Sequence, residues 1–243
     1  VGIGGSATND GGIGMAAGLG VAFYDEQGHL LRPVGASLGR VARIDTSAVP
    51  KALEDIELQV LTDVTNPLCG SQGATYIFGG QKGLNPLLFP AVDQAMQDFY
   101  QLADARILSM LGAGAGGGMA AGLVAFAGGK ISSGIEKSLD LIDFDRKVQK
   151  ADLVVVGEGR MDLQSLSGKA PVGVAKRTPE KIPVIAICGS LAEDLPAFPS
   201  HHIDAAFSIV PGPCEVADAL AHAERNLISC ARNIGNLLKI KAN

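Results

Sequence analysis

The sequence lacks an excess of basic residues, closely spaced cysteines and long apolar runs, and each absence argues against a class of protein. The formal net charge is −5 at pH 7, whereas a nucleic-acid-binding surface needs a basic face. The four cysteines form no Cys-x-x-Cys pair, which argues against a zinc site and a disulfide framework. No run of 18 apolar residues is present to cross a membrane. We therefore expect a protein of the reducing cytoplasm, without nucleic-acid or membrane partners.

Several familiar catalytic and nucleotide-binding motifs are missing as well. Gly168-Lys169 is followed by Ala170, where a P-loop needs Ser or Thr. Residues 112–117 match the letters of G-x-G-x-x-G, but no β-branched strand precedes them. No serine lies in a G-x-S-x-G turn, and no nucleophile pattern lies near His201 and His202, which we interpret as surface residues. The sequence therefore does not favour a P-loop enzyme, a dinucleotide-dependent oxidoreductase or a serine hydrolase.

Glycine, in contrast, is abundant: 32 of 243 residues, about twice its average usage. Residues 2–12, GIGGSATNDGG, form a glycine-rich stretch that we call the opening loop. Its backbone N–H groups, together with the start of a helix expected after Gly12, are suited to bind an anion. Asp10 in the same loop is suited to hold a divalent cation or a hydroxyl group. The alternative is that Asp10 only caps the helix that follows.

Three further segments place polar groups or glycines at the ends of predicted elements. Asp63 follows the alternating segment 56–62, which predicts a strand, and it is either a ligand-facing group or a turn residue. Lys82 lies between glycines in residues 79–83. From about Pro90, apolar residues that include Leu102 recur at helical spacing as far as Ala103, which predicts a helix whose apolar residues lie in the core. A second glycine cluster, residues 111–119, precedes an apolar helix predicted over 120–127. This cluster is either another phosphate-binding loop or a segment for tight helix packing.

The pattern of elements changes near residue 150. Residues 152–156, DLVVV, end in a continuous run of β-branched residues, which is typical of a strand buried on both faces of a parallel sheet. Strands are predicted over 152–156, 183–188 and 204–210, with a helix beginning at Pro171 and an amphipathic helix over 216–238. Short strand–helix–strand connections imply parallel pairing through right-handed crossovers.

These elements predict an α/β fold in two domains. We expect a mixed α/β domain over residues 1–148 that carries the glycine-rich substrate and phosphate loops. Residues 149–243 are expected to form the C-terminal part of a Rossmann-like parallel-sheet domain, with the active-site cleft between the two. The chain begins in what looks like the end of a strand, so we expect a fragment of a longer protein. A sheet of three strands is also expected to leave an apolar edge or face exposed.

The glycine-rich loops present several carboxylates and lysines: Asp10, Asp63, Glu158, Asp162, Lys82 and Lys169. Mg²⁺ is commonly bound by one or two carboxylates together with phosphate oxygens. A carboxylate can also accept the proton of an attacking hydroxyl, while lysines balance charge on the phosphoryl group that is transferred. The residues by themselves therefore indicate an enzyme that handles phosphate.

Five blocks of sequence, in this order along the chain, together resemble the bacterial glycerate kinase family (type 1). The blocks are residues 2–12, 62–70, 79–83, 112–118, and 157–164 with 168–173. The resemblance implies ATP-dependent phosphorylation of D-glycerate with Mg²⁺, and a second α/β domain inserted into a Rossmann-like domain. It implies small molecules as partners, D-glycerate and ATP, and leaves assembly into a homo-oligomer open. Family members carry further N-terminal residues. The alternative is a catalytically silent module that binds a sugar acid or a nucleotide.

The blocks assign candidate site residues. Asp10, Asp63 and Lys169 are the candidate catalytic residues, with Asp10 placed first because its loop is richest in glycine; an aspartate can act as proton acceptor or as metal ligand. The candidate metal ligands are Asp63, Glu158 and Asp162. The candidate substrate and phosphate contacts are Gly4, Gly5, Ser6, Thr8, Asn9, Asn66, Lys82, Gly114, Gly116, Gly157, Glu158 and Arg160. We expect Asp10, Asp63 and Glu158 to face a common cleft.

Overall fold

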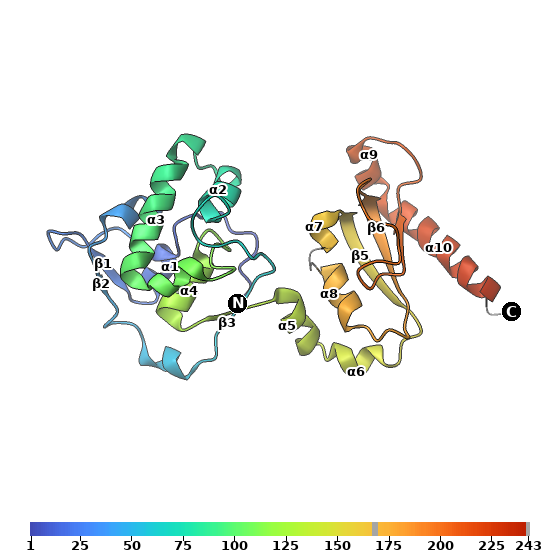
Figure 1. The fold of residues 1–243 in the computed structure, drawn as a ribbon, viewed down its shortest axis with the longest axis horizontal. Coiled ribbons are helices and arrows are strands. Elements are labelled where there is room, and N and C mark those ends of the chain that lie inside the picture. The colour runs from blue at the N-terminus through green and yellow to red at the C-terminus, as the bar shows by residue number, and fades with distance from the viewer. Residues whose placement is uncertain (167–169, 242–243) are drawn as a thin grey trace. The chain divides into compact units, whose positions relative to one another are not determined.

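The structure, a computed structural model, describes residues 1–166 and 170–241 and has a mixed α/β fold with parallel strand pairing (Figure 1). Lys169, a candidate catalytic residue, lies outside the described residues. The chain divides into two compact units, Val1–Gly134 and Ile135–Asn243. This division falls before the boundary expected at 148/149, so two short helices after Gly134 belong with the second unit.

The first unit combines helices with two small sheets. Its helices and strands are α1 (Ile13–Gly18), β1 (Ala22–Tyr24), β2 (Arg43–Asp45), β3 (Gln59–Leu61), α2 (Ala74–Phe78), α3 (Phe89–Ala103), α4 (Met119–Ala127) and β4 (Lys130–Ser132). Strands β1 and β2 pair antiparallel, and β3 and β4 pair parallel. Short 3₁₀ helices lie at Gly35–Arg40, Lys51–Asp55, Gly80–Lys82, Pro86–Leu88 and Ala105–Ser109. The strand near residue 60 and the helices at 89–103 and 119–127 agree with the sequence pattern.

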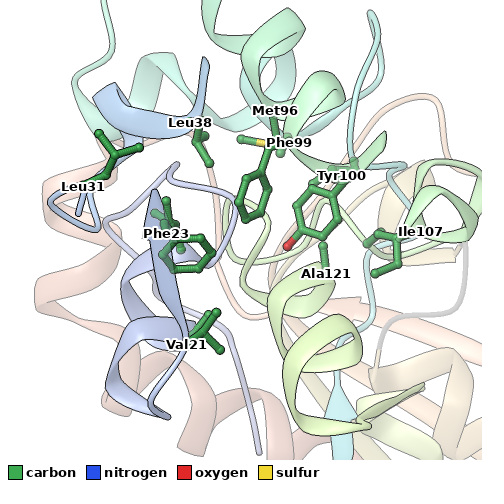
Figure 2. Close-up of a cluster of buried hydrophobic side chains, with 14 residues drawn as sticks. Val21, Phe23, Leu31, Leu38, Met96, Phe99, Tyr100, Ile107 and Ala121 are labelled. Carbon is green, nitrogen blue, oxygen red and sulfur yellow. The ribbon is translucent and has the colours of Figure 1, made fainter. Parts of the chain in front are cut away.

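The core of the first unit is built on α3. Phe99 and Tyr100 of α3 are fully buried beside Phe23 of β1, and the Phe23 and Phe99 rings lie 5.7 Å apart (Figure 2). The hydroxyl of Tyr100 donates a hydrogen bond to the carbonyl of Gly11 at 2.5 Å, which ties the opening loop to the core. Leu102, which the helical period also assigns to the core, is 50% exposed because it lies near the end of α3.

The opening loop and the second glycine cluster pack against each other through their backbones. The N–H of Gly11 donates to the carbonyl of Gly117 at 3.0 Å. Gly118, the residue before α4, has a φ of 89°, and a Cβ there would lie 2.5 Å from the Cα of Gly11. Only glycine permits so close an approach of two backbones. At this contact, therefore, the second glycine cluster acts as a packing segment, which is one of the two alternatives predicted from the sequence.

The second unit is built on a parallel sheet. Its elements are α5 (Gly134–Leu141), α6 (Phe144–Val148), β5 (Val154–Met161), α7 (Leu163–Leu166), α8 (Ala170–Arg177), β6 (Val184–Leu191), β7 (Ala205–Ser208), α9 (Val216–Ala221) and α10 (Ala223–Lys241). The strands lie in the order β5-β6-β7 and all pair parallel, as the sequence predicts. Helices α7 and α8 lie on one side of the sheet and α10 on the other (Figure 1). A buried cluster that includes Val156, Val172, Val184 and Ile203 joins α8 to the sheet.

Two expectations for the second unit are wrong in detail. Strands β5 and β6 continue through Gly157–Met161 and Gly189–Leu191, which the sequence places in loops; the pairs Arg160–Ser190 and Met161–Leu191 show that each strand supports the other's extension. The amphipathic helix expected over 216–238 is two helices, α9 and α10, which meet at His222. Part of the apolar face expected there is exposed, with Leu220 at 72%, because these side chains border a cavity instead of a packed core.

None of the helices in the described part of the chain combines the length and the hydropathy that a membrane span needs.

The glycine contact gives a prediction about stability. We expect Gly118→Ala to lower the free energy of unfolding by about 3 kcal/mol, since a Cβ at this positive φ meets the backbone of Gly11. Chemical denaturation measures the change. Gly18→Ala is the matched control, because a Cβ at this helical position meets no atom within 4 Å and should change stability by less than about 1 kcal/mol. Equal stability of the two variants would contradict the packing role of Gly118.

Candidate functional site

A cavity of about 390 Å³ in the first unit gathers four of the five sequence blocks. We call it the glycine-loop pocket. It is lined by residues 2–6 of the opening loop, residues 61–64 at the end of β3, Phe78, Gln81 and Lys82 beside the 3₁₀ helix Gly80–Lys82, and Ala115, Gly116 and Gly134. Gly4, Gly5, Ser6, Asp63, Lys82 and Gly116 are candidate residues that the fold brings together here.

The opening loop lies next to Asp63 because its first residues run beside β3. Gly2 forms a parallel bridge with Leu61, and the N–H of Leu61 donates to the carbonyl of Val1 at 2.8 Å. Both segments therefore run in the same direction and end at the same edge, where parallel strands usually present their functional groups. A Cβ placed on Gly4 or Gly5 would meet no atom within 4 Å, so these two glycines border open space.

Lys82 fixes the shape of the opening loop. Its ammonium group donates to the hydroxyl of Ser6 and to the carbonyl of Thr8, each at 2.9 Å. Partial burial lowers the pKa of Lys82 from its ordinary value, and the nearby charge of Asp10 opposes this shift. A lysine has three N–H donors, so an ammonium held in this way can also contact an anion in the pocket.

Asp63 lies two residues after the end of β3, near the strand end that the sequence predicts, and its carboxylate meets the start of α5. Its Oδ1 accepts hydrogen bonds from the N–H of Gly134 at 2.8 Å and from the hydroxyl of Ser133 at 3.3 Å. A carboxylate beside the first turn of a helix is favoured by the partial positive charge there. The backbone of another element thus orients an exposed carboxylate at the pocket.

Asp10 has a different environment. Its two carboxylate oxygens accept from the N–H groups of Gly12 at 2.9 Å and Gly14 at 3.3 Å, at the start of α1. Asp10 does not line the glycine-loop pocket. These contacts match the capping alternative, while its charge still acts on Lys82. A catalytic role for Asp10 stays a prediction.

Four other candidates from the first unit hold loops and do not line the pocket. Thr8 contributes its carbonyl to Lys82, and the side chain of Asn9 donates to the hydroxyl of Thr75 at 3.1 Å. Asn66 donates to the carbonyl of Gln72 at 2.8 Å and accepts, through its own carbonyl, from the N–H of Gly114 at 3.1 Å. These residues support the segments that carry the pocket.

The candidates of the second unit lie on and after β5. Gly157 and Glu158 border a larger cavity, of about 870 Å³, between the sheet and helices α9 and α10. Arg160 is exposed on β5 and does not line this cavity. The carboxylate of Asp162 accepts from the N–H of Ser165 at 2.9 Å, a capping contact at the start of α7. The common cleft expected for Asp10, Asp63 and Glu158 stays a prediction.

The three candidate metal ligands do not form a ready-made cage. Among the described residues, no group of three or more His, Cys, Asp or Glu side chains could hold a metal ion. Asp63 is the carboxylate that lines the glycine-loop pocket, and Glu158 is the carboxylate that lines the larger cavity. Single carboxylates of this kind fit Mg²⁺ only where phosphate oxygens supply further ligands.

Sequence reasoning missed some residues of the pocket. Gln81 lies next to Lys82 in the 79–83 block, so its place in the pocket could have been predicted from that block. Phe78 reads as one more apolar residue of α2. Gly134 gave no local signal, because it meets Asp63 across 71 positions of sequence.

Comparison with known proteins gives a consistent result. The model of the glycerate kinase family matches residues 1–239. Glycerate kinase from Neisseria meningitidis serogroup B is 56% identical over 240 residues, covering 99% of this chain and 65% of that protein. Glycerate 2-kinase from Escherichia coli K12 is 39% identical, covering 99% of this chain and 64% of that protein. The chain thus spans about two thirds, 64–65%, of the length of these relatives.

A solved structure supports the same relationship. The crystal structure of a protein from Salmonella typhimurium LT2, assigned as a glycerate kinase 2, superposes with a TM-score of 0.80 at 41% identity, covering 99% of this chain and 64% of that one. Sequence and fold agree over nearly the whole chain, and we conclude that the chain belongs to the glycerate kinase family.

Proposed function

We propose that the protein transfers a phosphoryl group from ATP to D-glycerate, with the acid bound in the glycine-loop pocket. The observation that carries this proposal is that Lys82 and Asp63, each held by hydrogen bonds, line the same small cavity. Gly4 and Gly5, which border open space, line it as well. The volume of about 390 Å³ is at the small end of ligand sites, which suits a three-carbon acid. Family membership supports the same substrate and ATP as the donor.

In this proposal the opening loop and Lys82 bind the carboxylate of the acid. Gly4 and Gly5 leave room for a ligand to approach the backbone, whose N–H groups can donate to an anion. The ammonium of Lys82 adds positive charge at the same place and, through Ser6 and Thr8, keeps the loop in its binding shape. Substrate binding would therefore cost little rearrangement of the loop.

Asp63 is proposed to accept the proton of the attacking hydroxyl. Its Oδ1 is anchored by Gly134 and Ser133, so the carboxylate is held in one orientation before the substrate arrives. Positioned proton acceptors of this kind contribute to phosphoryl transfer by activating the nucleophile. Asp10, held at the start of α1, is proposed to act mainly through its charge on Lys82.

The second unit is proposed to contact the nucleotide. Its parallel sheet with helices on both sides supports part of a Rossmann-like domain, in which the ends of the strands face ligands. Gly157, Glu158 and Arg160 on β5 are the proposed contacts, and Lys169 remains a proposed phosphate contact. Mg²⁺, when bound with the phosphates, would neutralise their charge, and Asp63 or Glu158 could each offer it one carboxylate. The four cysteines are free, and we propose a cytoplasmic setting.

Asp63→Asn is the first test of the proposed function. With purified full-length protein, ATP, Mg²⁺ and D-glycerate, we expect formation of ADP and of a phosphoglycerate identified by NMR. Asp63→Asn should lower kcat by about two orders of magnitude, since an amide cannot accept the proton. Asp55→Asn, at an exposed aspartate of the 3₁₀ helix Lys51–Asp55, is the matched control and should leave kcat unchanged. Glycerate binding without turnover in the unmodified protein would point instead to a silent binding module.

Asp10→Asn separates capping from catalysis. An amide in place of the carboxylate loses one of the two acceptors at the start of α1, so we expect one hydrogen bond to be lost and stability to fall by about 1 kcal/mol. The loss of kcat should be smaller than that of Asp63→Asn. Denaturation and steady-state kinetics measure the two effects. If Asp10→Asn lowers kcat as much as Asp63→Asn does and leaves stability unchanged, Asp10 is the main catalytic residue and not only a helix cap.

The lowered pKa of Lys82 predicts a pH dependence. Because burial favours the neutral amine, Lys82 should lose its proton at a lower pH than a solvated lysine does. The kcat/KM for glycerate should therefore fall on the alkaline side before an ordinary lysine would titrate. In Lys82→Arg the positive charge persists, and the alkaline fall should move to higher pH. An identical alkaline limb in both proteins would exclude Lys82 as the titrating group.

A further inference from the structure

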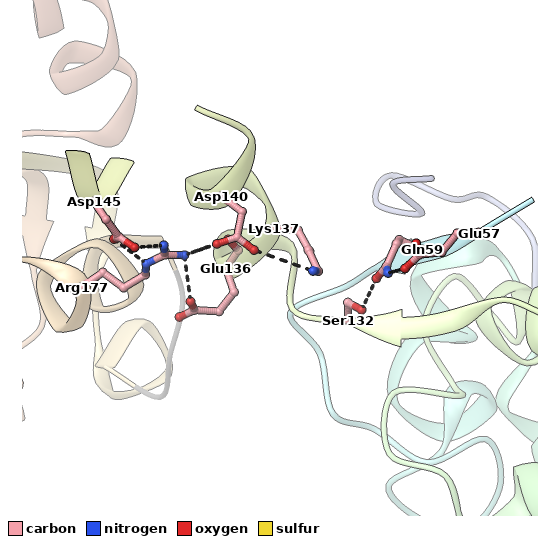
Figure 3. Close-up of polar contacts among 8 residues, drawn as sticks. All are labelled: Glu57, Gln59, Ser132, Glu136, Lys137, Asp140, Asp145 and Arg177. Atoms are coloured by element: carbon pink, nitrogen blue, oxygen red, sulfur yellow. Dashed lines mark hydrogen bonds and ion pairs between the residues drawn. The ribbon is translucent and has the colours of Figure 1, made fainter. Parts of the chain in front are cut away.

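The two sides of the glycine-loop pocket are supported in different ways. On the Asp63 side, β3 and β4 pair as parallel strands, and the hydroxyl of Ser132 donates to the side chain of Gln59 at 2.6 Å (Figure 3). On the Lys82 side, the pocket is lined by residues of α2 and of the 3₁₀ helix that follows it. The position of Lys82 therefore depends on the contacts that hold these two helices.

Residues 74–82 form one continuous helical segment, which we call the lysine segment because it ends at Lys82. Its two helices are joined by Gly79, whose φ of −61° and ψ of −42° are themselves helical. The N–H of Gly79 donates to the carbonyl of Thr75 at 2.9 Å, and the N–H of Lys82 donates to the carbonyl of Gly79 at 3.1 Å. Because each turn is bonded to the next, contacts that fix the start of the segment also fix its end at Lys82.

A buried carboxylate of α3 holds the loop that leads into the lysine segment. Asp93 is 9% exposed, and the N–H of Gly70 donates to its two oxygens, at 3.0 and 3.2 Å. The loop after Gly70 is compact. The N–H of Gly73 donates to the carbonyl of Gly70 at 2.7 Å, and the N–H of Ala74 donates to the carbonyl of Leu68 at 2.9 Å. The position of Gly70 therefore sets where the lysine segment begins.

The middle of the lysine segment contacts both α3 and the opening loop. The ring of Phe89, the first residue of α3, lies 5.7 Å from that of Tyr76, and a Cβ on Gly80 would lie 3.6 Å from it. The hydroxyl of Thr75, which is fully buried, accepts from the side-chain amide of Asn9 at 3.1 Å. The lysine segment thus joins α3 to the opening loop.

Helix α3 consequently supports the opening loop by two routes. The direct route is the hydrogen bond from the Tyr100 hydroxyl to the Gly11 carbonyl. The indirect route runs from Asp93 through the lysine segment to Lys82, whose ammonium binds Ser6 and the next carbonyl but one along the loop. Both routes lie within the unit Val1–Gly134. The indirect route determines where the ammonium of Lys82 lies in the pocket.

We propose that Asp93 is a positioning residue for substrate binding: by fixing Gly70 and so the start of the lysine segment, it places the ammonium of Lys82 where the carboxylate of the acid binds. This inference rests on the proposed function of Lys82. Asp93 does not line the glycine-loop pocket, so its effect passes through the lysine segment and not through contact with a ligand.

A double-mutant cycle tests this route. Asp93→Ala should raise KM for glycerate about tenfold and change kcat by less than about twofold, because Lys82 binds the acid and does not take its proton. In a Lys82→Met background the same substitution should cause no further rise in KM, since the group being positioned is gone. An equal rise in KM from Asp93→Ala in both backgrounds would overturn the proposal.

Two further variants of α3 control the kinetic test. Asp93→Asn keeps an oxygen that can accept from the Gly70 N–H, so KM should rise by less than about threefold. Asp98→Ala is the matched control on the same helix, because Asp98 is exposed and accepts from Gln94 of α3. This variant should leave KM unchanged. A rise in KM for Asp98→Ala as large as that for Asp93→Ala would also contradict the proposal.

Amide exchange gives a readout that does not require turnover. NMR of full-length Asp93→Ala should show exchange of the Lys82 amide about tenfold faster, while the Gly11 amide, which is bonded to Gly117 and supported by Tyr100, exchanges at an unchanged rate. Equal acceleration at both amides would indicate a general loss of stability and overturn the positioning role. If Asp93→Ala does not fold, Phe89→Leu, which weakens the other contact between α3 and the lysine segment, should give the same changes.

The two measurements also separate this inference from the proposed function. If the unmodified protein does not phosphorylate glycerate, but Asp93→Ala speeds exchange at Lys82 and not at Gly11, the proposed function alone is overturned. If glycerate is phosphorylated and Asp93→Ala changes neither KM nor the exchange of the Lys82 amide, the positioning role of Asp93 alone is overturned.

Discussion

Direct backbone contact between the opening loop and the second glycine cluster is the constraint on which the candidate site depends. Gly11 bonds to Gly117, and Gly118 approaches Gly11 so closely that no side chain fits. This contact sets α1 and α4 side by side, and Tyr100 secures it from the core through the Gly11 carbonyl. The first part of the opening loop, residues 2–6, is held beside the end of β3 by the Gly2–Leu61 bridge and by the contact of Lys82 with Ser6. The pocket exists because one part of the loop packs backbone against backbone, while Gly4 and Gly5 in the adjoining part border open space.

Glycine consequently has two roles within one sequence motif. In the packed part it removes side chains so that two backbones can touch, as at Gly117 and Gly118. In the open part it leaves space at the cavity, as at Gly4 and Gly5. Because both roles use the same residue type, the sequence alone left two interpretations of the second glycine cluster, a phosphate-binding loop and a segment for tight helix packing. The atoms that surround each glycine in the structure distinguish the two roles, whereas the local sequence pattern does not.

Much of the local structure could be predicted from the sequence, and the long-range contacts could not. The helical period marked α3, the β-branched run marked β5, and Asp63 was placed correctly at the end of a strand because each signal lies within a few residues. The extension of β5 through Gly157 and Glu158 was missed, since it depends on β6 continuing beside it. The anchors of Lys82 and Asp63 were missed for a similar reason: Ser6 lies 76 positions away from Lys82, and Gly134 lies 71 from Asp63. The family resemblance supplied the site residues as a set but not the way each one is held.

The distribution of aromatic side chains has an experimental consequence. The chain has no tryptophan and three tyrosines, Tyr24, Tyr76 and Tyr100, and all three belong to the unit Val1–Gly134. Tyrosine fluorescence therefore originates in the unit that contains the glycine-loop pocket. Tyr100, buried and bonded to Gly11, makes part of this emission sensitive to the packing behind the opening loop. Far-ultraviolet circular dichroism records the helices of both units. Following the two signals together during denaturation would distinguish loss of the pocket-bearing unit from loss of the parallel-sheet unit without any introduced label.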